Sequence, residues 1–133
     1  MTNQTLNVGI PTPVKIFTWI LICAGCFFFY VYTFNPAISF PNASLDTYSA
    51  KMGFGSTGVR IIGGVLILLV SLLANKPSWL FATLLGRVFV EIGDLILGLI
   101  LDGFTPNTIA LIVLASLEIW AVSRLWKVIK SKP

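Results

Sequence analysis

Three ionisable side chains lie close together inside a long apolar stretch of the chain. Arg87, Glu91 and Asp94 fall within Trp79–Leu101, which is long and apolar enough to cross a bilayer as a helix. At about 100° per residue, these side chains share one narrow face of that helix. A charge in hydrocarbon costs at least about 2.5 to 3.5 kcal/mol on insertion scales. The charged face must therefore turn toward other helices or toward a wet cavity.

Two charged residues of other apolar stretches are expected to join this face. Counting about 1.5 Å per residue from the predicted helix ends places Arg60 at the depth of Asp94. The same count places Glu118 at the depth of Arg87. We therefore predict a ligand-binding cluster in the helix interior, made of Arg60, Arg87, Glu91, Asp94 and Glu118. Two arginines do not balance three carboxylates, so one carboxyl group is expected to be protonated at pH 7.

The chemistry open to such a cluster falls into several classes. A neutral carboxyl group beside an ionised one can act as general acid and base, and Glu91 and Asp94 are the candidate catalytic residues of an isomerase or cyclase acting within the membrane. The cluster could instead bind an amphiphilic small molecule, such as a lipid or a quinone, between the helices. Arg87 and Glu91 are also four residues apart, so a salt bridge that only fixes helix packing, as in an accessory or structural subunit, gives the same pattern. A monomeric transporter is not expected, because there is no inverted repeat.

Composition indicates the environment of these groups. The chain has 133 residues, of which 56% are hydrophobic and only 11% charged, and its mean hydropathy is +0.92, which is typical of one small integral membrane domain covering residues 1–133. The net charge of +4 comes from basic residues at segment ends, so we do not expect a nucleic-acid partner. The sequence has no histidine, the commonest metal ligand, and no metal site is predicted.

Hydropathy predicts four spans that position the cluster, at about 16–34, 52–74, 79–101 and 108–126. The breaks after the second and third spans are short, so the expected fold is an all-α, up-down-up-down, four-helix transmembrane bundle. On one side of the membrane, Lys51 is the only basic residue that flanks the predicted spans. The other side carries six basic residues, Lys15, Lys76, Arg124, Lys127, Lys130 and Lys132. The positive-inside rule then places both termini in the cytoplasm, and we expect a multi-pass protein of a bacterial inner membrane.

Small residues recur in two of the spans. The second span contains Gly53, Gly55, Ser56, Gly58 and the pair Gly63-Gly64, which predicts a close approach between helix backbones. In the first span, Cys23-Ala-Gly-Cys26 has the spacing of a redox pair. A thiolate is disfavoured within an apolar span, so we interpret these cysteines as small packing residues.

The charged and glycine motifs also resemble a known family. They are, in chain order, Arg60-Ile-Ile-Gly63-Gly64, Gly86-Arg87, Asp102-Gly103-Phe-Thr-Pro106 and Leu117-Glu118. Their order and spacing resemble the DoxX-like superfamily of small four-helix integral membrane proteins, in its branches that share no established activity. That superfamily includes a small membrane subunit of thiosulfate:quinone oxidoreductase, so the resemblance adds quinone to the candidate ligands. A homo-oligomer or a partner membrane subunit is a further candidate partner. Many members have an acidic residue where Gly58 stands, and here Glu91 and Asp94 could supply that charge.

Overall fold

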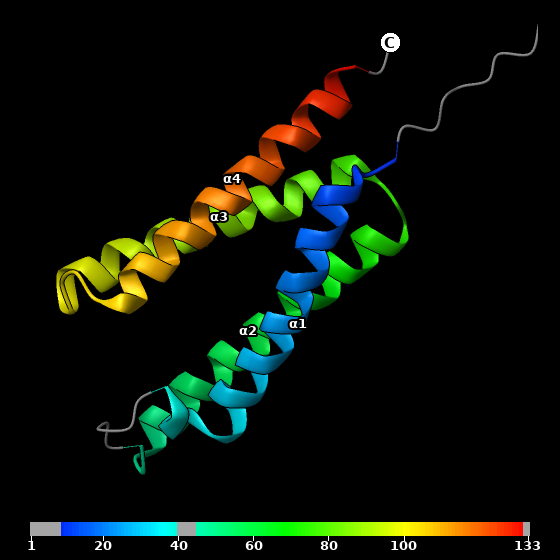
Figure 1. Cartoon of the computed structure of the whole chain (residues 1–133). Coiled ribbons are helices and arrows are strands. Elements are labelled where there is room, and N and C mark those ends of the chain that lie inside the picture. The colour runs from blue at the N-terminus through cyan, green and yellow to red at the C-terminus, as the bar shows by residue number, and fades with distance from the viewer. Residues whose placement is uncertain (1–8, 40–44, 132–133) are drawn as a thin grey trace, which may run out of the picture. The chain divides into compact units, whose positions relative to one another are not determined.

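The computed structural model describes residues 9–39 and 45–131 of the chain (Figure 1). Within these ranges the chain forms long α-helices, with no strand. The elements are α1 (Thr12–Phe34), a 3-10 turn (Pro36–Ile38), α2 (Tyr48–Leu73), α3 (Pro77–Leu101) and α4 (Pro106–Lys130). The all-α, four-helix fold class is therefore confirmed, and each helix begins a few residues before the predicted span.

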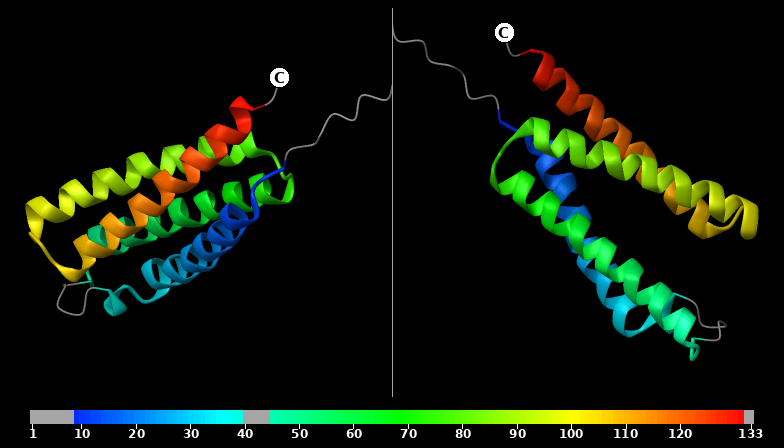
Figure 2. Two further views of the ribbon diagram at one scale, coloured as in Figure 1. Left: turned by 45° about the horizontal axis from the view of Figure 1, so that its top comes forward. Right: turned by 180° about the vertical axis from the view of Figure 1, so that it is seen from behind.

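The chain divides into two compact units. One unit covers residues 16–70 and contains most of α1 and α2, and the other covers residues 1–15 together with 71–133 and contains α3 and α4. Each unit is built around one antiparallel pair of helices, which run side by side in every view (Figures 1 and 2). The predicted cluster residues other than Arg60 belong to the α3–α4 unit.

The α1–α2 pair is held by close approach at two glycines. A Cβ atom placed on Gly25 of α1 would overlap the side chain of Val65 on α2, and one placed on Gly58 of α2 would overlap the hydroxyl group of Thr33 on α1. Only a residue without a side chain fits at either position. Of the small residues expected to permit this approach, Gly58 is confirmed in that role. A Cβ at Gly53, Gly55, Gly63 or Gly64 would meet no atom of the described residues within 4 Å.

A tight turn joins α3 to α4, at the place that the sequence predicts. Asp102 is the C-cap of α3, and Gly103 follows it with a φ of 70°, the left-handed conformation that favours glycine. Thr105 is the N-cap of α4 and forms a reciprocal capping box with Thr108. The Thr105 amide donates to the Thr108 hydroxyl at 2.8 Å, and the Thr108 amide donates to the Thr105 hydroxyl at 3.4 Å. The turn thereby satisfies the backbone amides of Thr105 and Thr108.

Two contacts fix the antiparallel register of α3 and α4. The ring of Phe81, near the start of α3, stacks on that of Trp126, near the end of α4, with centroids 5.4 Å apart. Gly98, near the end of α3, lies against Thr108 in the first turn of α4, where an added Cβ would be 3.2 Å from the threonine methyl group. The start of α3 therefore lies beside the end of α4, and Arg87 falls opposite the middle of α4.

The helices have the length and composition of membrane spans. Three of the described helices, α1, α2 and α4, are long and apolar enough to cross a membrane, and a third or less of each apolar window is buried. Such large exposed apolar surfaces are typical of a protein solvated by lipid. We therefore describe the chain as a membrane protein. The helix α3 contains three charged residues, Arg87, Glu91 and Asp94. With these charges, length and composition alone do not identify α3 as a membrane span. A fourth span at 79–101 stays a prediction.

The Gly25–Val65 contact generates a stability prediction. Gly25→Ala should lower the free energy of unfolding by about 1 to 3 kcal/mol, because the new methyl group overlaps a buried, branched side chain. Adding Val65→Ala should recover most of the loss, since it removes the overlapping methyl group. Thermal unfolding in a mild nonionic detergent, followed by circular dichroism, measures both effects. The matched control is Gly63→Ala, whose methyl group meets no described residue within 4 Å, and equal stability of the two single variants would contradict the prediction.

Candidate functional site

One guanidinium group binds two carboxylates between α3 and α4. The Nε of Arg87 donates to Oε1 of Glu118 at 2.7 Å, and one terminal nitrogen of Arg87 donates to Oε1 of Glu91 at 2.9 Å. Glu91 lies one turn after Arg87 on α3, whereas Glu118 comes from the middle of α4. Both bonds are short and charge-assisted, the strong class of hydrogen bond. The predicted association of Arg87, Glu91 and Glu118 is therefore confirmed.

The cluster becomes more buried from Arg87 to Glu118. The side chain of Arg87 is 28% exposed and that of Glu91 11%, whereas that of Glu118 is 0% exposed. The second carboxylate oxygen of Glu118, Oε2, is also buried and has no hydrogen-bond partner among the described residues. A carboxylate oxygen is a strong acceptor, and leaving one buried without a donor is costly. The cluster therefore contains an acceptor that protein groups of the described ranges do not satisfy.

The charges within the cluster do not cancel. With both carboxyl groups ionised, Arg87 supplies one positive charge against two negative ones, and the negative charges of Glu118 and Asp94 act repulsively on Glu91. In surroundings of low polarity, an uncompensated charge is stable only if it gains a proton, a counter-charge or several hydrogen bonds. The cluster is thus suited to receive a proton, a cation or a hydrogen-bond donor.

The other predicted site residues lie outside these bonds. Asp94 is exposed on α3 and makes no hydrogen bond or ion pair within the described part of the chain. The carboxylate of Glu91 is bonded to Arg87 and not to Asp94, its proposed catalytic partner. Arg60 is exposed on α2, in the other unit. The catalytic roles of Glu91 and Asp94, and the participation of Arg60, stay predictions.

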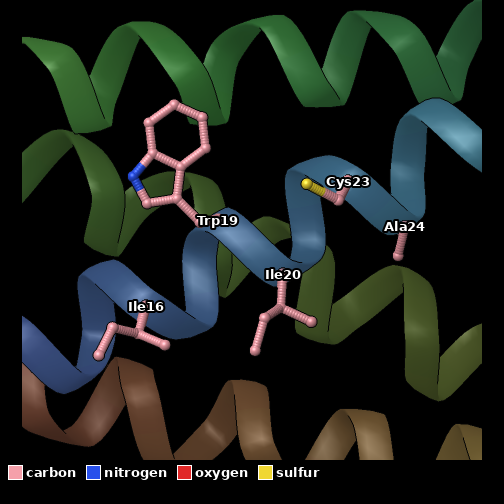
Figure 3. A pocket seen from close by; sticks show the side chains of 5 residues that line it. All are labelled: Ile16, Trp19, Ile20, Cys23 and Ala24. Carbon is pink, nitrogen blue, oxygen red and sulfur yellow. The ribbon is translucent and has the colours of Figure 1, made fainter.

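A shallow apolar pocket on α1 is a feature that sequence reasoning missed. It has a volume of about 500 Å³ and is lined by Ile16, Trp19, Ile20, Cys23 and Ala24 (Figure 3). Ile16, Ile20 and Ala24 point to one side of the helix, and the sulfur of Cys23 lies on the side of the Trp19 ring. The feature of the sequence that could have predicted this pocket is the decrease in side-chain size from Trp19 to Ala24. All five of these residues belong to α1, whereas the Arg87 cluster belongs to α3 and α4.

The cysteines of α1 are both free thiols. Cys23 and Cys26 are exposed on α1 and form no disulfide with each other. Gly25, between them, makes the close contact with Val65. At this part of α1, close packing therefore depends on the glycine and not on the cysteines.

Comparison with known proteins gives no assignment. No protein-family model, no curated protein and no solved structure matches the chain. The resemblance to the DoxX-like superfamily stays a prediction, based on the motifs alone.

The cluster generates a prediction about stability. Arg87→Met should lower the free energy of unfolding by about 3 to 5 kcal/mol, because Glu118 is left buried without its cation. Combining Arg87→Met with Glu118→Met should recover most of this loss, since it removes both charges and keeps apolar volume. Unfolding by titration with sodium dodecyl sulfate in mixed micelles measures the differences. Arg124→Met, at an exposed position of α4, is the control, and an Arg87→Met protein as stable as this control would refute the prediction.

Proposed function

We propose that this membrane protein binds the polar head of an amphiphilic molecule, a lipid or a quinone-like compound, at the Arg87 cluster. The observation that supports the proposal is the buried Oε2 atom of Glu118, which has no donor among the described residues. A ligand that supplies this donor removes the cost of burying the atom. We further propose that the chain is a multi-pass protein of a bacterial inner membrane, has cytoplasmic termini and belongs to the DoxX-like superfamily.

The cluster is chemically complementary to a head that both donates and accepts hydrogen bonds. Glu118 Oε2 accepts, and a hydroxyl group or a protonated amine is the matching donor. Arg87 has five N–H donors, of which one on Nε and one on a terminal nitrogen are engaged by the carboxylates. Its remaining N–H groups can donate to a carbonyl or phosphate oxygen. A quinol or a hydroxyl-bearing lipid offers both kinds of group, and the apolar surfaces of the helices accommodate its tail.

A second candidate function is favoured by the two short bonds themselves. The bond from Arg87 to Glu118 joins α3 to α4, and the bond from Arg87 to Glu91 orients the guanidinium group for it. If joining the helices is the only role of the cluster, it fixes the packing of the α3–α4 pair, as in an accessory or structural subunit. No ligand is needed for this role. This function differs from the first in predicting no stoichiometric small molecule.

The test is the identity and amount of the amphiphile that copurifies in a mild nonionic detergent. The unaltered protein should retain about one molecule per chain, measured by mass spectrometry. Glu118→Gln should reduce this occupancy about tenfold or more, because a hydrogen bond to a charged group contributes about 1.5 to 3 kcal/mol. Ser116→Ala is the control, since that exposed hydroxyl group donates only to Ile112 of its own helix.

Two results would contradict ligand binding at the cluster. One is a folded, unaltered protein that carries no small molecule in stoichiometric amount. The other is a Glu118→Gln variant that retains as much of the molecule as the control. Either result, together with the stability loss predicted for Arg87→Met, would favour the purely structural function.

A further inference from the structure

Basic residues gather at one end of the α3–α4 pair. Because the start of α3 lies beside the end of α4, the N-cap residue of α3, Lys76, is at the same end as the last turns of α4. Those turns carry Arg124, Lys127 and Lys130, and all four side chains belong to exposed residues. We call these four residues the basic end. Lys132 follows them in the sequence but lies outside the described residues.

Tryptophan rings accompany the cations of the basic end. The ammonium group of Lys76 lies 4.9 Å from the ring centre of Trp79, and that of Lys130 lies 5.1 Å from that of Trp126. The guanidinium group of Arg124 is 6.0 Å from the ring centre of Trp120. Cation–π contacts of this kind hold a cation near the surface without neutralising its charge. Tryptophan is also the residue that prefers the boundary between hydrocarbon and headgroups.

The described parts of α3 and α4 around the basic end carry no carboxylate side chain. The segments 76–86 and 119–131 contain no aspartate or glutamate, and the basic residues form no ion pair within the described part of the chain. The nearest acidic residues along the sequence, Glu91 and Glu118, are bonded to Arg87. At the opposite end of the helix pair stands Asp102, and residues 88–123 contain no lysine or arginine. The charge of the pair is therefore strongly asymmetric along its length.

We propose that the basic end is a binding surface for acidic phospholipid headgroups. Four exposed cations without carboxylates are complementary to phosphates that carry a net negative charge. The accompanying tryptophans and the apolar span of α4 place the cations where headgroups lie. A nucleic acid has the same negative phosphates, but it has no hydrocarbon to contact the exposed apolar residues that flank the basic end, such as Trp126. This proposal does not depend on a ligand at the Arg87 cluster.

The experiment compares lipid association in proteoliposomes of phosphatidylcholine and phosphatidylglycerol mixed in equal amounts. Spin-labelled phosphatidylglycerol should associate with the unaltered protein several-fold more strongly than spin-labelled phosphatidylcholine. Lys130→Gln should lower this several-fold ratio markedly, and Lys127→Gln with Lys130→Gln should bring it to about one, because each basic residue near a charged surface contributes about a fivefold change in binding. Lys127→Arg with Lys130→Arg should retain the ratio. Raising the salt concentration should weaken the preference.

The matched control is Lys51→Gln, which removes one exposed lysine at the start of α2. The proposal is overturned if the unaltered protein shows no preference for phosphatidylglycerol. It is also overturned if Lys51→Gln lowers the ratio as much as Lys130→Gln, because the effect would then follow net charge and not the basic end. Circular dichroism of each reconstituted variant confirms that the helices are intact. Preferential binding of a short DNA duplex over phosphatidylglycerol vesicles would likewise reject the lipid assignment.

Discussion

The α3–α4 pair depends on one guanidinium group shared by two carboxylates. Replacing buried ion pairs with apolar side chains is often close to neutral in free energy, whereas removing one partner is severely destabilising. The bonds of Arg87 to Glu91 and Glu118 therefore specify the pairing of the two helices more than they add stability. A shift of α4 by one residue moves Glu118 about 1.5 Å along the axis and turns it by about 100°. Such a shift takes Glu118 away from Arg87, so the register is fixed by chemistry as well as by packing.

The two helix pairs of the chain are stabilised in different ways. In the α1–α2 pair the contacts are between small and branched side chains, with Gly25 against Val65 and Gly58 against Thr33. In the α3–α4 pair the glycine contact at Gly98 is joined by buried ion pairs. Steric fit between apolar helices tolerates small rotations, whereas an ion pair in apolar surroundings does not. The side-chain ion pairs within the described residues all belong to the α3–α4 pair.

Much of the fold follows from the sequence because hydropathy and helix-ending residues are strong local signals. The apolar runs bounded by Asn35-Pro36, Pro77 and Asp102-Gly103 predict the helices closely, since proline and left-handed glycine interrupt helices regardless of tertiary structure. The association of Arg87 with Glu118 also follows, because a short turn sets the relative depth of two antiparallel helices. The exposure of Asp94 could not be predicted from the sequence, because helical periodicity places Asp94 on the same face as the buried Glu91. Which glycines meet a neighbouring helix depends on the rotation of each helix, and periodicity alone leaves that rotation open.

The turn between α3 and α4 bears on how the chain enters a bilayer. The exchange of hydrogen bonds between Thr105 and Thr108 occupies backbone donors at the first turn of α4, and Pro106 has none to occupy. Hydrocarbon penalises each backbone donor that lacks an acceptor. A turn in which the amides of Thr105 and Thr108 are already engaged loses less hydration in an apolar layer than one in which these amides are free. The carboxylate of Asp102, the C-cap of α3, is then the charged group nearest this turn, and its desolvation is the largest remaining cost of placing the turn in an apolar layer.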